Sequence, residues 1–388
     1  MARLSMEEAD VRVRRLAGAG LDAHAFFEGA GETVARAVPI GGAPPFWNTV
    51  DPQSQLITSI HFSGDCFFDL GAQIEWEYVA EDVNKTADVI ANQRGVQTLH
   101  EVTGGHPERS PVFREYLRPN GIDQEVAVTL RARTGEVWGT LRLNRAPGQP
   151  EFSTRELTFL RSLAPRLAEG VQRALLLGEA VEPDWPDAPG LVVLGRGLSV
   201  ESISVSANRW LGELTGDSGG IPAAVLSVAA QAGNPEGPAL VRLRADTGRW
   251  FVLHGTSMTT PAGHRAAVII QPAAHERISS VLMAAYGLTR REREVTRLVL
   301  KGRSTAVIAD ELVIAPATVQ QHLKSIFAKT GVRSRRDLVC TVFADHYDAR
   351  VRDNEERRVA ARPARGGPKG PATSRQGAAD DEPFLGER

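Results

Sequence analysis

The 388-residue chain lacks several features that mark particular classes of protein. It contains two cysteines, Cys66 and Cys340, which excludes a disulfide framework or a cysteine-rich zinc module and fits a reducing cytoplasm. No apolar run approaches the ~20 residues that a membrane helix requires; the best candidates, Leu191–Leu194 and Ala266–Ile270, have the length of strands. The first ten residues contain three carboxylates and no apolar stretch, so we expect no secretory signal peptide.

A large net charge is also missing, but the formal charge of −2 conceals an uneven distribution. Residues 1–283 carry 25 Lys or Arg and 33 Asp or Glu, residues 284–345 carry 11 and 6, and residues 346–388 carry 9 and 8. The three parts therefore have net charges of −8, +5 and +1. A compact basic module on an acidic body is the electrostatic pattern expected of a DNA-binding domain attached to another domain.

The first part of the chain alternates between helix and strand patterns. The pattern predicts a helix over residues 21–38, stopped by Pro39, and strands beginning near Phe46 and at Ile57. A β-hairpin is predicted from two runs of alternating apolar and polar residues on either side of a Thr-Gly-Glu turn. These runs are Glu125–Leu130 and the stretch that starts at Val137. A capping-box spacing, Ser153 with Glu156, then opens a long amphipathic helix that extends to about Leu177.

A second mixed pattern follows a stretch rich in Pro, Asp and Glu, and leads through a helix at His275–Ala285 into the basic module. Past Ala349 the chain has little apolar bulk, so we predict disorder there. The predicted fold is therefore multidomain: α+β domains with antiparallel sheets and flanking helices, followed by an all-α four-helix helix-turn-helix domain. The predicted order is an N-terminal extension (1–20), a first α+β domain (21–178), a linker (179–189), a second α+β domain (190–273), a connector helix (274–286), the four-helix domain (287–346) and a disordered tail (349–388).

The basic module reads as four short helices. Thr289 and Glu292 form a capping box at the start of the first helix, and Ser304 is a cap for the second. A tight turn at 313–315 leads to a third helix that begins at Pro316 and stops at Gly331. Two short helices joined by a tight turn, the second with a polar outer face, describe a helix-turn-helix.

The residue pattern of this module resembles the LuxR-type DNA-binding domain over about residues 282–346. The matching positions are Leu288, Thr289, Arg291, Glu292, Glu294, Val295, Gly302, Ile308, Ala309, Leu312, Thr318, Val319, His322, Ile326, Phe327, Lys329, Gly331, Val332, Ser334 and Arg335. The chain departs from the family at three positions: Ala315 replaces a capping Ser or Thr, Val307 replaces an acidic residue, and Gln320 replaces a common Lys. Loss of the cap is expected to weaken the start of the third helix by ~1 kcal/mol.

The resemblance implies which residues meet DNA. Gln320, Gln321 and Lys324 match the base-facing positions, and Thr318 and Val319 lie at the start of the same helix. Their chemistry agrees, because Gln pairs with adenine edges and Lys donates to guanine. The basic residues that flank the helix, Arg303, Lys329 and Arg333, suit phosphate contacts.

The order of elements in residues 21–177 resembles a GAF domain, and residues 191–271 are similar to a PAS domain. Both are sensor folds that bind a small molecule or mediate contacts. Three aromatic residues, Trp76, Tyr78 and Trp138, are candidates for lining a pocket, but they are equally well explained as core or surface aromatics, and the core is the interpretation that we favour.

Other local patterns do not assemble into chemistry. Gly216–Gly220 matches the nucleophile motif of a serine protease, but neither His24 nor His61 stands in the matching upstream setting. Gly195-Arg196-Gly197 lacks the third glycine of a dinucleotide fingerprint. Single residues (His100, Glu101 and His106 as metal ligands, Cys66 as a redox sensor) are more simply explained as loop residues and a buried thiol.

The sequence therefore predicts a cytoplasmic, sequence-specific transcription regulator that is not an enzyme, with no metal or cofactor. The expected partners are double-stranded DNA, a second copy of the chain on DNA and an unknown small-molecule effector, with no membrane. The alternative is a small-molecule-binding protein or an enzyme whose N-terminal region carries the main activity.

Overall fold

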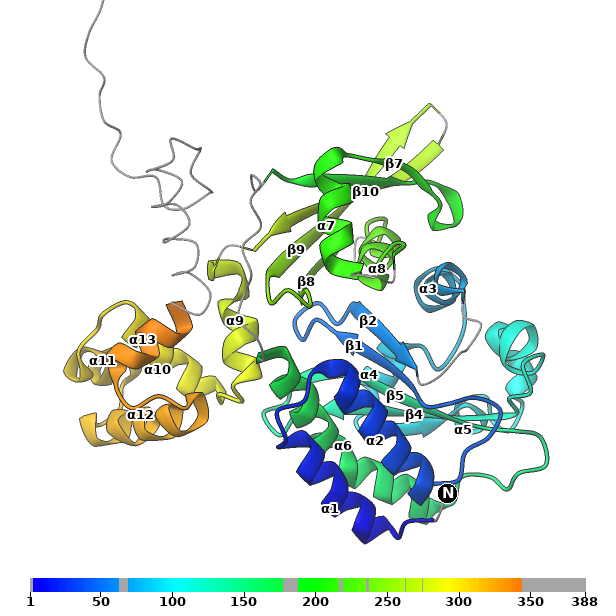
Figure 1. The fold of residues 1–388 in the computed structure, drawn as a ribbon, viewed down its shortest axis with the longest axis horizontal. Coiled ribbons are helices and arrows are strands. Elements are labelled where there is room, and N and C mark those ends of the chain that lie inside the picture. Colours follow the sequence, from blue (N-terminus) through cyan, green and yellow to red (C-terminus); the bar gives the residue numbers. More distant parts are fainter. Residues whose placement is uncertain are drawn as a thin grey trace, which may run out of the picture.

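The computed structural model describes residues 3–62, 69–176, 188–215, 219–234, 237–261, 263–273 and 275–343. Two antiparallel sheets with flanking helices form the larger part, and a small helical domain lies to one side of them (Figure 1). The multidomain α+β and all-α fold class predicted from the sequence is confirmed. The predicted linker lies largely, and the predicted tail entirely, outside the described residues.

Sheet A has the strand order β2-β1-β5-β4-β3. Its strands are β1 (Phe46–Val50), β2 (Ile57–Phe62), β3 (Val96–Thr98), β4 (Gln124–Arg131) and β5 (Val137–Arg145). The predicted hairpin is confirmed, since β4 and β5 pair from Gln124 opposite Arg145 to Arg131 opposite Val137. Both of these strands are buried along almost their whole length, so each face of the sheet is covered.

One face of sheet A is apolar and packs on three helices, α1 (Met6–Ala17), α2 (Ala23–Ala37) and α6 (Thr154–Leu176). Alternate strand residues such as Trp47, Val126 and Leu141 are fully buried there. The predicted Ser153–Glu156 capping contacts are present at the start of α6. Helix α1 was not predicted: Ala9, Val13 and Ala17 bury it in this core, so residues 1–20 are not a mere extension.

The other face of sheet A carries polar residues and is covered by short helices. They are α3 (Leu70–Tyr78), α4 (Thr86–Ala91), α5 (Leu99–Val102), η1 (Pro107–Arg109) and η2 (Phe113–Leu117). None of these was predicted from the sequence. The alternating pattern of the strands predicts that this face is exposed to solvent. The short helices cover it, so its polar residues are buried.

Sheet B has the order β7-β6-β10-β9-β8, which repeats the order of sheet A with the strands counted from its own start. Its strands are β6 (Gly190–Leu194), β7 (Val200–Ile203), β8 (Leu240–Arg244), β9 (Trp250–Thr260) and β10 (Gly263–Pro272), with η3 (Arg196–Leu198), α7 (Val205–Thr215) and α8 (Ala223–Gln231) beside them. The likeness of residues 190–273 to a PAS domain stays a prediction, and the shared strand order is consistent with it.

The two sheets are joined by a continuous core rather than by a loose contact. The Ser227 hydroxyl on α8 donates to the Ile57 carbonyl at 2.6 Å, and both residues belong to the contact of α8 with β2. Buried Asp51, in the turn after β1, accepts from the backbone and the guanidinium of Arg242 at 2.7 and 3.0 Å. The two α+β domains therefore form one packed body in this structure.

Helix α9 (His275–Ala285) connects this body to the helical domain, as predicted for residues 274–286. Its apolar residues, among them Ile278 and Leu282, pack in the core beneath sheet A, and the Gln172 side chain on α6 donates to the Ala284 carbonyl at 3.0 Å. The helical domain consists of α10 (Arg290–Leu300), α11 (Thr305–Leu312), α12 (Pro316–Thr330) and α13 (Arg335–Phe343).

The close approach of α6 to α2 yields a prediction on stability. A Cβ at Gly170 would lie 2.0 Å from the ring of buried Phe26, so Gly170→Ala should destabilise the protein by about 1–2 kcal/mol despite the better helix propensity of Ala. Urea unfolding of the full chain measures this. Gly212→Ala on α7, where no atom lies within 4 Å, is the matched control and should gain about 0.5–1 kcal/mol. Equal effects at the two glycines would contradict the packing argument.

Candidate DNA-binding interface and sensory cavity

Helices α11 and α12 form the predicted helix-turn-helix. The Ser304 hydroxyl accepts from the Val307 amide at 3.4 Å and caps α11. Val313 turns the chain in the left-handed conformation with φ 53°, and α12 begins at Pro316. The N-cap of α12 is Ala315, which has no side-chain hydrogen bond, so the expected absence of this cap is confirmed.

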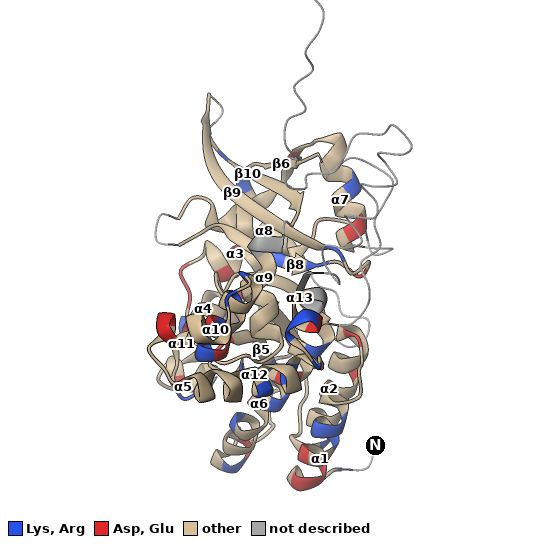
Figure 2. Cartoon of the chain, turned by 90° about the vertical axis from the view of Figure 1, so that its left-hand side faces the viewer, with Lys and Arg blue, Asp and Glu red and all other residues tan. Residues whose placement is uncertain are grey.

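The outer face of α12 is polar and open. Gln320, Gln321 and Lys324 are exposed, and Thr318 at the start of the helix is half-buried. Gln320 lies 3.4 Å from the Thr305 hydroxyl, which ties its amide to α11. Viewed from the side of this domain, basic segments gather on α10, α12 and α13 (Figure 2).

Two of the implied contact residues also have a role in the structure of the domain itself. Val319 is fully buried in the core formed by α10–α13, where its side chain holds α12 in place. The Lys329 ammonium donates to Glu292 at 2.7 Å and to the Gly287 carbonyl at 3.0 Å. Two of its three donor hydrogens thus stabilise the fold.

The remaining flanking arginines lie on the surface. Arg303 forms an exposed ion pair with Glu311 on α11, with 3.4 Å between nitrogen and oxygen. Arg333, in the segment between α12 and α13, is exposed. Both positions are open to a phosphate backbone that approaches the outer face of α12.

Glu292 organises the inner side of the same domain. Its carboxylate accepts from Ser325 at 2.6 Å, from Lys329 at 2.7 Å and from the Thr289 amide at 2.7 Å, which completes the predicted capping box. Burial opposes ionisation of this carboxyl, but the hydrogen bonds outweigh burial and lower its pKa to about 2. Helices α10 and α12 are therefore joined by one buried, charged residue.

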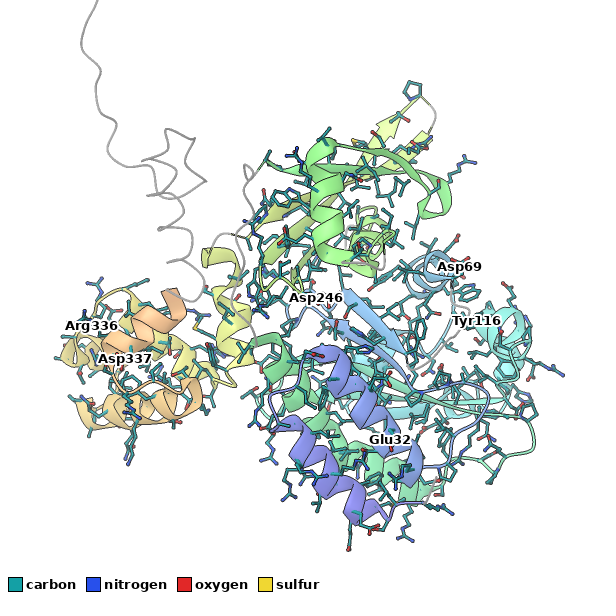
Figure 3. All side chains as sticks on the ribbon, viewed as in Figure 1. Glu32, Asp69, Tyr116, Asp246, Arg336 and Asp337 are labelled. Atoms are coloured by element: carbon teal, nitrogen blue, oxygen red, sulfur yellow. The ribbon has the colours of Figure 1, made fainter. Side chains whose placement is uncertain are left out.

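A cavity of about 90 Å³ lies in the first sensor domain, between the polar face of sheet A and its covering helices. Apolar and aromatic side chains form much of the wall, and Trp76 on α3 packs against Tyr116 with ring centroids 5.0 Å apart. Figure 3 shows Tyr116 in the helical layer beside α3. Charged and amide side chains line the rest: Gln73, Glu77, Asp82, Asn84, Lys85, Glu125, Arg142 and Asn144.

A buried polar network centres on Arg142, in strand β5. Its guanidinium donates to Glu125 at 2.7 Å and to the Asn84 carbonyl at 2.8 Å, and Glu77 lies 3.8 Å away. Burial raises the pKa of Glu77, and attraction to Arg142 offsets only part of that rise. These residues were missed in the sequence; the signal was the placement of Glu125 on β4, and of Thr140, Arg142 and Asn144 on β5, at positions that alternate with apolar residues.

The three candidate aromatic residues have different roles. Trp76 lines the cavity, contrary to the interpretation we favoured. Trp138 is 1% exposed in the core on the opposite face of the sheet. The Tyr78 hydroxyl accepts from the Ile57 amide at 2.8 Å, and burial raises its pKa.

The described residues do not assemble the remaining sequence patterns into a catalytic, metal or nucleotide site. His106 contacts Glu108 at 3.1 Å, and among the described residues no group of three His, Cys, Asp or Glu side chains is placed to hold a metal. Gly195-Arg196-Gly197 lies between β6 and β7 and opens no α-helix. Cys66 and part of the Gly216–Gly220 motif lie outside the described residues. No helix in the described segments is long and apolar enough to cross a membrane.

Comparison with known proteins agrees with the two resemblances. Residues 287–342 match the bacterial regulatory proteins of the LuxR family, and residues 48–171 match the GAF domain. Over 52 residues the chain is 42% identical to the spore germination protein GerE of Bacillus subtilis, 70% of which is covered by 13% of this chain. The chain therefore belongs to the LuxR family of bacterial regulatory proteins, and it carries a GAF domain in its N-terminal half.

Other relatives share only the DNA-binding module. The monoamine regulon transcriptional regulator of Klebsiella aerogenes is 48% identical over 52 residues, which are 13% of this chain and 23% of that protein. The chain spans only 6% of the length of the mycobacterial regulators it matches at 50% identity. A phycoerythrobilin-bound GAF domain from a cyanobacterial phytochrome is 14% identical with a TM-score of 0.32, over 45% of this chain and 98% of that one. The family assignment rests on the sequence matches alone.

The Glu292 network leads to a pH-dependent prediction. The folded pKa lies below the unfolded one, so the carboxylate stabilises the protein above pH 4.5, and this stabilisation is lost as the pH falls towards 2. Glu292→Gln should lower the free energy of unfolding by about 3 kcal/mol at pH 7 and by progressively less below pH 4.5. Calorimetry of both proteins between pH 7 and 3 measures this. Glu311→Gln, in an exposed pair, is the control and should change little; a pH-independent deficit for Glu292→Gln would contradict the assignment.

The missing cap at Ala315 leads to a second prediction. Ala315→Ser should stabilise the start of α12 by about 1 kcal/mol, because a hydroxyl there would accept from an amide in the first turn. Slower hydrogen exchange of the amides of α12 would report it. Ala328→Ser, exposed in the last turn of the same helix, is the control and should cost a few tenths of a kcal/mol. Faster exchange in both variants would rule out a capping role.

Proposed function

We propose that the protein is a sequence-specific DNA-binding transcription regulator in which a GAF sensor controls the helix-turn-helix domain. The observation that carries this proposal is the outer face of α12, where Gln320, Gln321 and Lys324 are exposed on a helix whose inner face is firmly packed. The family match and the net charge of +5 on residues 284–345 support it.

In this proposal the contacts divide by chemistry. Gln320, Gln321 and Lys324 read base edges in the major groove, and Thr318 lies near the backbone. Arg303 and Arg333 bind phosphates, which position the domain without specifying sequence. Lys329 adds its remaining donor while it holds Glu292.

We further propose that two copies bind adjacent half-sites, as single helix-turn-helix domains read short sites and gain affinity in pairs. The cavity on sheet A is the place where a small-molecule effector would act, by stabilising one arrangement of the sensor over another. The protein would work in the cytoplasm and catalyse no reaction. No feature of the described residues favours the enzyme alternative.

A binding selection against random DNA, followed by titration of the preferred site, tests the proposal. Gln321→Ala should weaken binding to the preferred site by about 1–3 kcal/mol and relax selectivity at one base pair. Arg333→Ala should weaken binding to all sequences alike and lower the slope of affinity against salt by about 1.

Arg155→Ala is the matched control for the loss of positive charge, because Arg155 is exposed on α6 in the sensory region. It should leave affinity, selectivity and salt dependence unchanged. A full chain that shows no sequence-selective, salt-sensitive binding would refute the proposal.

A further inference from the structure

The polar side chains on one face of sheet A are organised by specific hydrogen bonds. Where α4 covers it, its polar side chains are paired: Asn48 donates to Thr86 at 2.9 Å and accepts from Thr140 at 2.8 Å, and Thr129 donates to the Val89 carbonyl at 2.7 Å. Buried polar groups are normally paired in this way, because an unpaired one costs about 1–3 kcal/mol.

The same face is incomplete where it borders the cavity. Arg142 Nε and Asn144 Oδ1 are buried and have no hydrogen-bond partner in the described residues. Both side chains line the cavity, and each is more than nine-tenths buried. One is a donor and the other is an acceptor, two positions apart on β5. The two atoms on this face that lack a hydrogen-bond partner therefore belong to residues that line the cavity. A ligand in the cavity would supply the missing partners.

The charges of the lining exclude a simple anion site. The Arg142 guanidinium is already matched by Glu125 at 2.7 Å, with Glu77 beyond it at 3.8 Å. The other lining cation, Lys85, donates to the Ala80 carbonyl and shares the lining with Asp82. Because positive charge does not exceed negative charge, a carboxylate or phosphate would lose its hydration without gaining an unmatched cation.

The apolar part of the wall indicates the shape of the occupant. Trp76 and Tyr116 pack together on one side, and Phe46 and Phe62, paired across β1 and β2, lie on the sheet. Aromatic walls of this kind favour a flat ring, and a cavity of about 90 Å³ is of the size that suits one ring rather than a large cofactor.

We propose that this cavity binds a small, uncharged, planar ring compound that bears a hydrogen-bond acceptor for Arg142 and a donor for Asn144, with the chemistry of an aromatic carboxamide. This inference deepens the proposed function and rests on it for its regulatory meaning. Binding itself is measurable without reference to DNA.

Three one-ring probes of similar size separate the features of the proposal. Benzamide offers an acceptor and a donor, acetophenone offers the acceptor alone, and benzoate is an anion. Calorimetric titration of the full chain should rank benzamide first. Acetophenone should bind about ten-fold or more weakly, because Asn144 Oδ1 stays unpaired, and benzoate should bind more weakly still.

Variants of the full chain locate the site. Asn144→Leu should lower the affinity for benzamide to that for acetophenone and leave the affinity for acetophenone unchanged, which also shows that the variant is folded. Asn208→Leu makes the same substitution at an exposed position of α7 and should change neither value.

The outcomes distinguish this inference from the proposed function. Benzoate binding as tightly as benzamide, benzamide binding that survives Asn144→Leu, or no binding of either neutral probe by a chain that still selects a DNA site would each overturn the ligand assignment alone. Ranked probe binding by a chain that selects no DNA site would support the cavity assignment and refute the proposed function instead.

Discussion

The packing of α9 into two hydrophobic cores at once is the constraint on which the arrangement of this molecule depends. Ile278, Leu282 and Ala284 belong to the core beneath sheet A, and Trp250 at the start of β9 reaches the same cluster. Met283, between them in sequence, belongs to the core of the helical domain. Helix α9 is thus part of the core of each domain that it connects. A shift of α6, of sheet B or of α10 would therefore displace α9 directly, because these cores are tightly packed.

The two faces of sheet A differ in chemistry and in what covers them. Its apolar face supplies the main core, whereas its polar face is covered by helices that leave a cavity. Helix α3 connects that cavity with the second sheet: Gln73, Trp76 and Glu77 line the cavity, and Ile74 on another side of the same helix packs in the core shared with α8. A rotation of α3 would therefore alter the cavity and the interface between the two α+β domains together.

The parts that the sequence predicted well are those in which local pattern and tertiary environment agree. Capping at Thr289 and Ser304, the turn before Pro316 and the β4–β5 hairpin all followed from spacing alone. The cavity did not, because Glu125 and Arg142 look like solvent-facing strand residues until the covering helices are known. Val319 and Lys329 were placed by resemblance to a family, and only packing showed that one is buried and the other is held by Glu292. Short covering helices such as α4, six residues long, carry too few turns for periodicity to reveal.

The joint between α9 and α10 has a mechanical consequence. The Leu288 amide donates to the Met283 carbonyl at 3.1 Å, Lys329 reaches back to Gly287, and Arg293 on α10 pairs with Glu136 at the tip of the β4–β5 hairpin. These contacts hold the helical domain in a fixed orientation relative to the N-terminal domains. A DNA-binding domain on a flexible linker adapts to half-sites at many separations. A domain held in a fixed orientation presents its recognition helix at one angle and one position relative to the rest of the chain. If two chains bind DNA together as proposed, the half-site separation that they accept is then set by the geometry of the N-terminal domains and not by the DNA-binding domain alone.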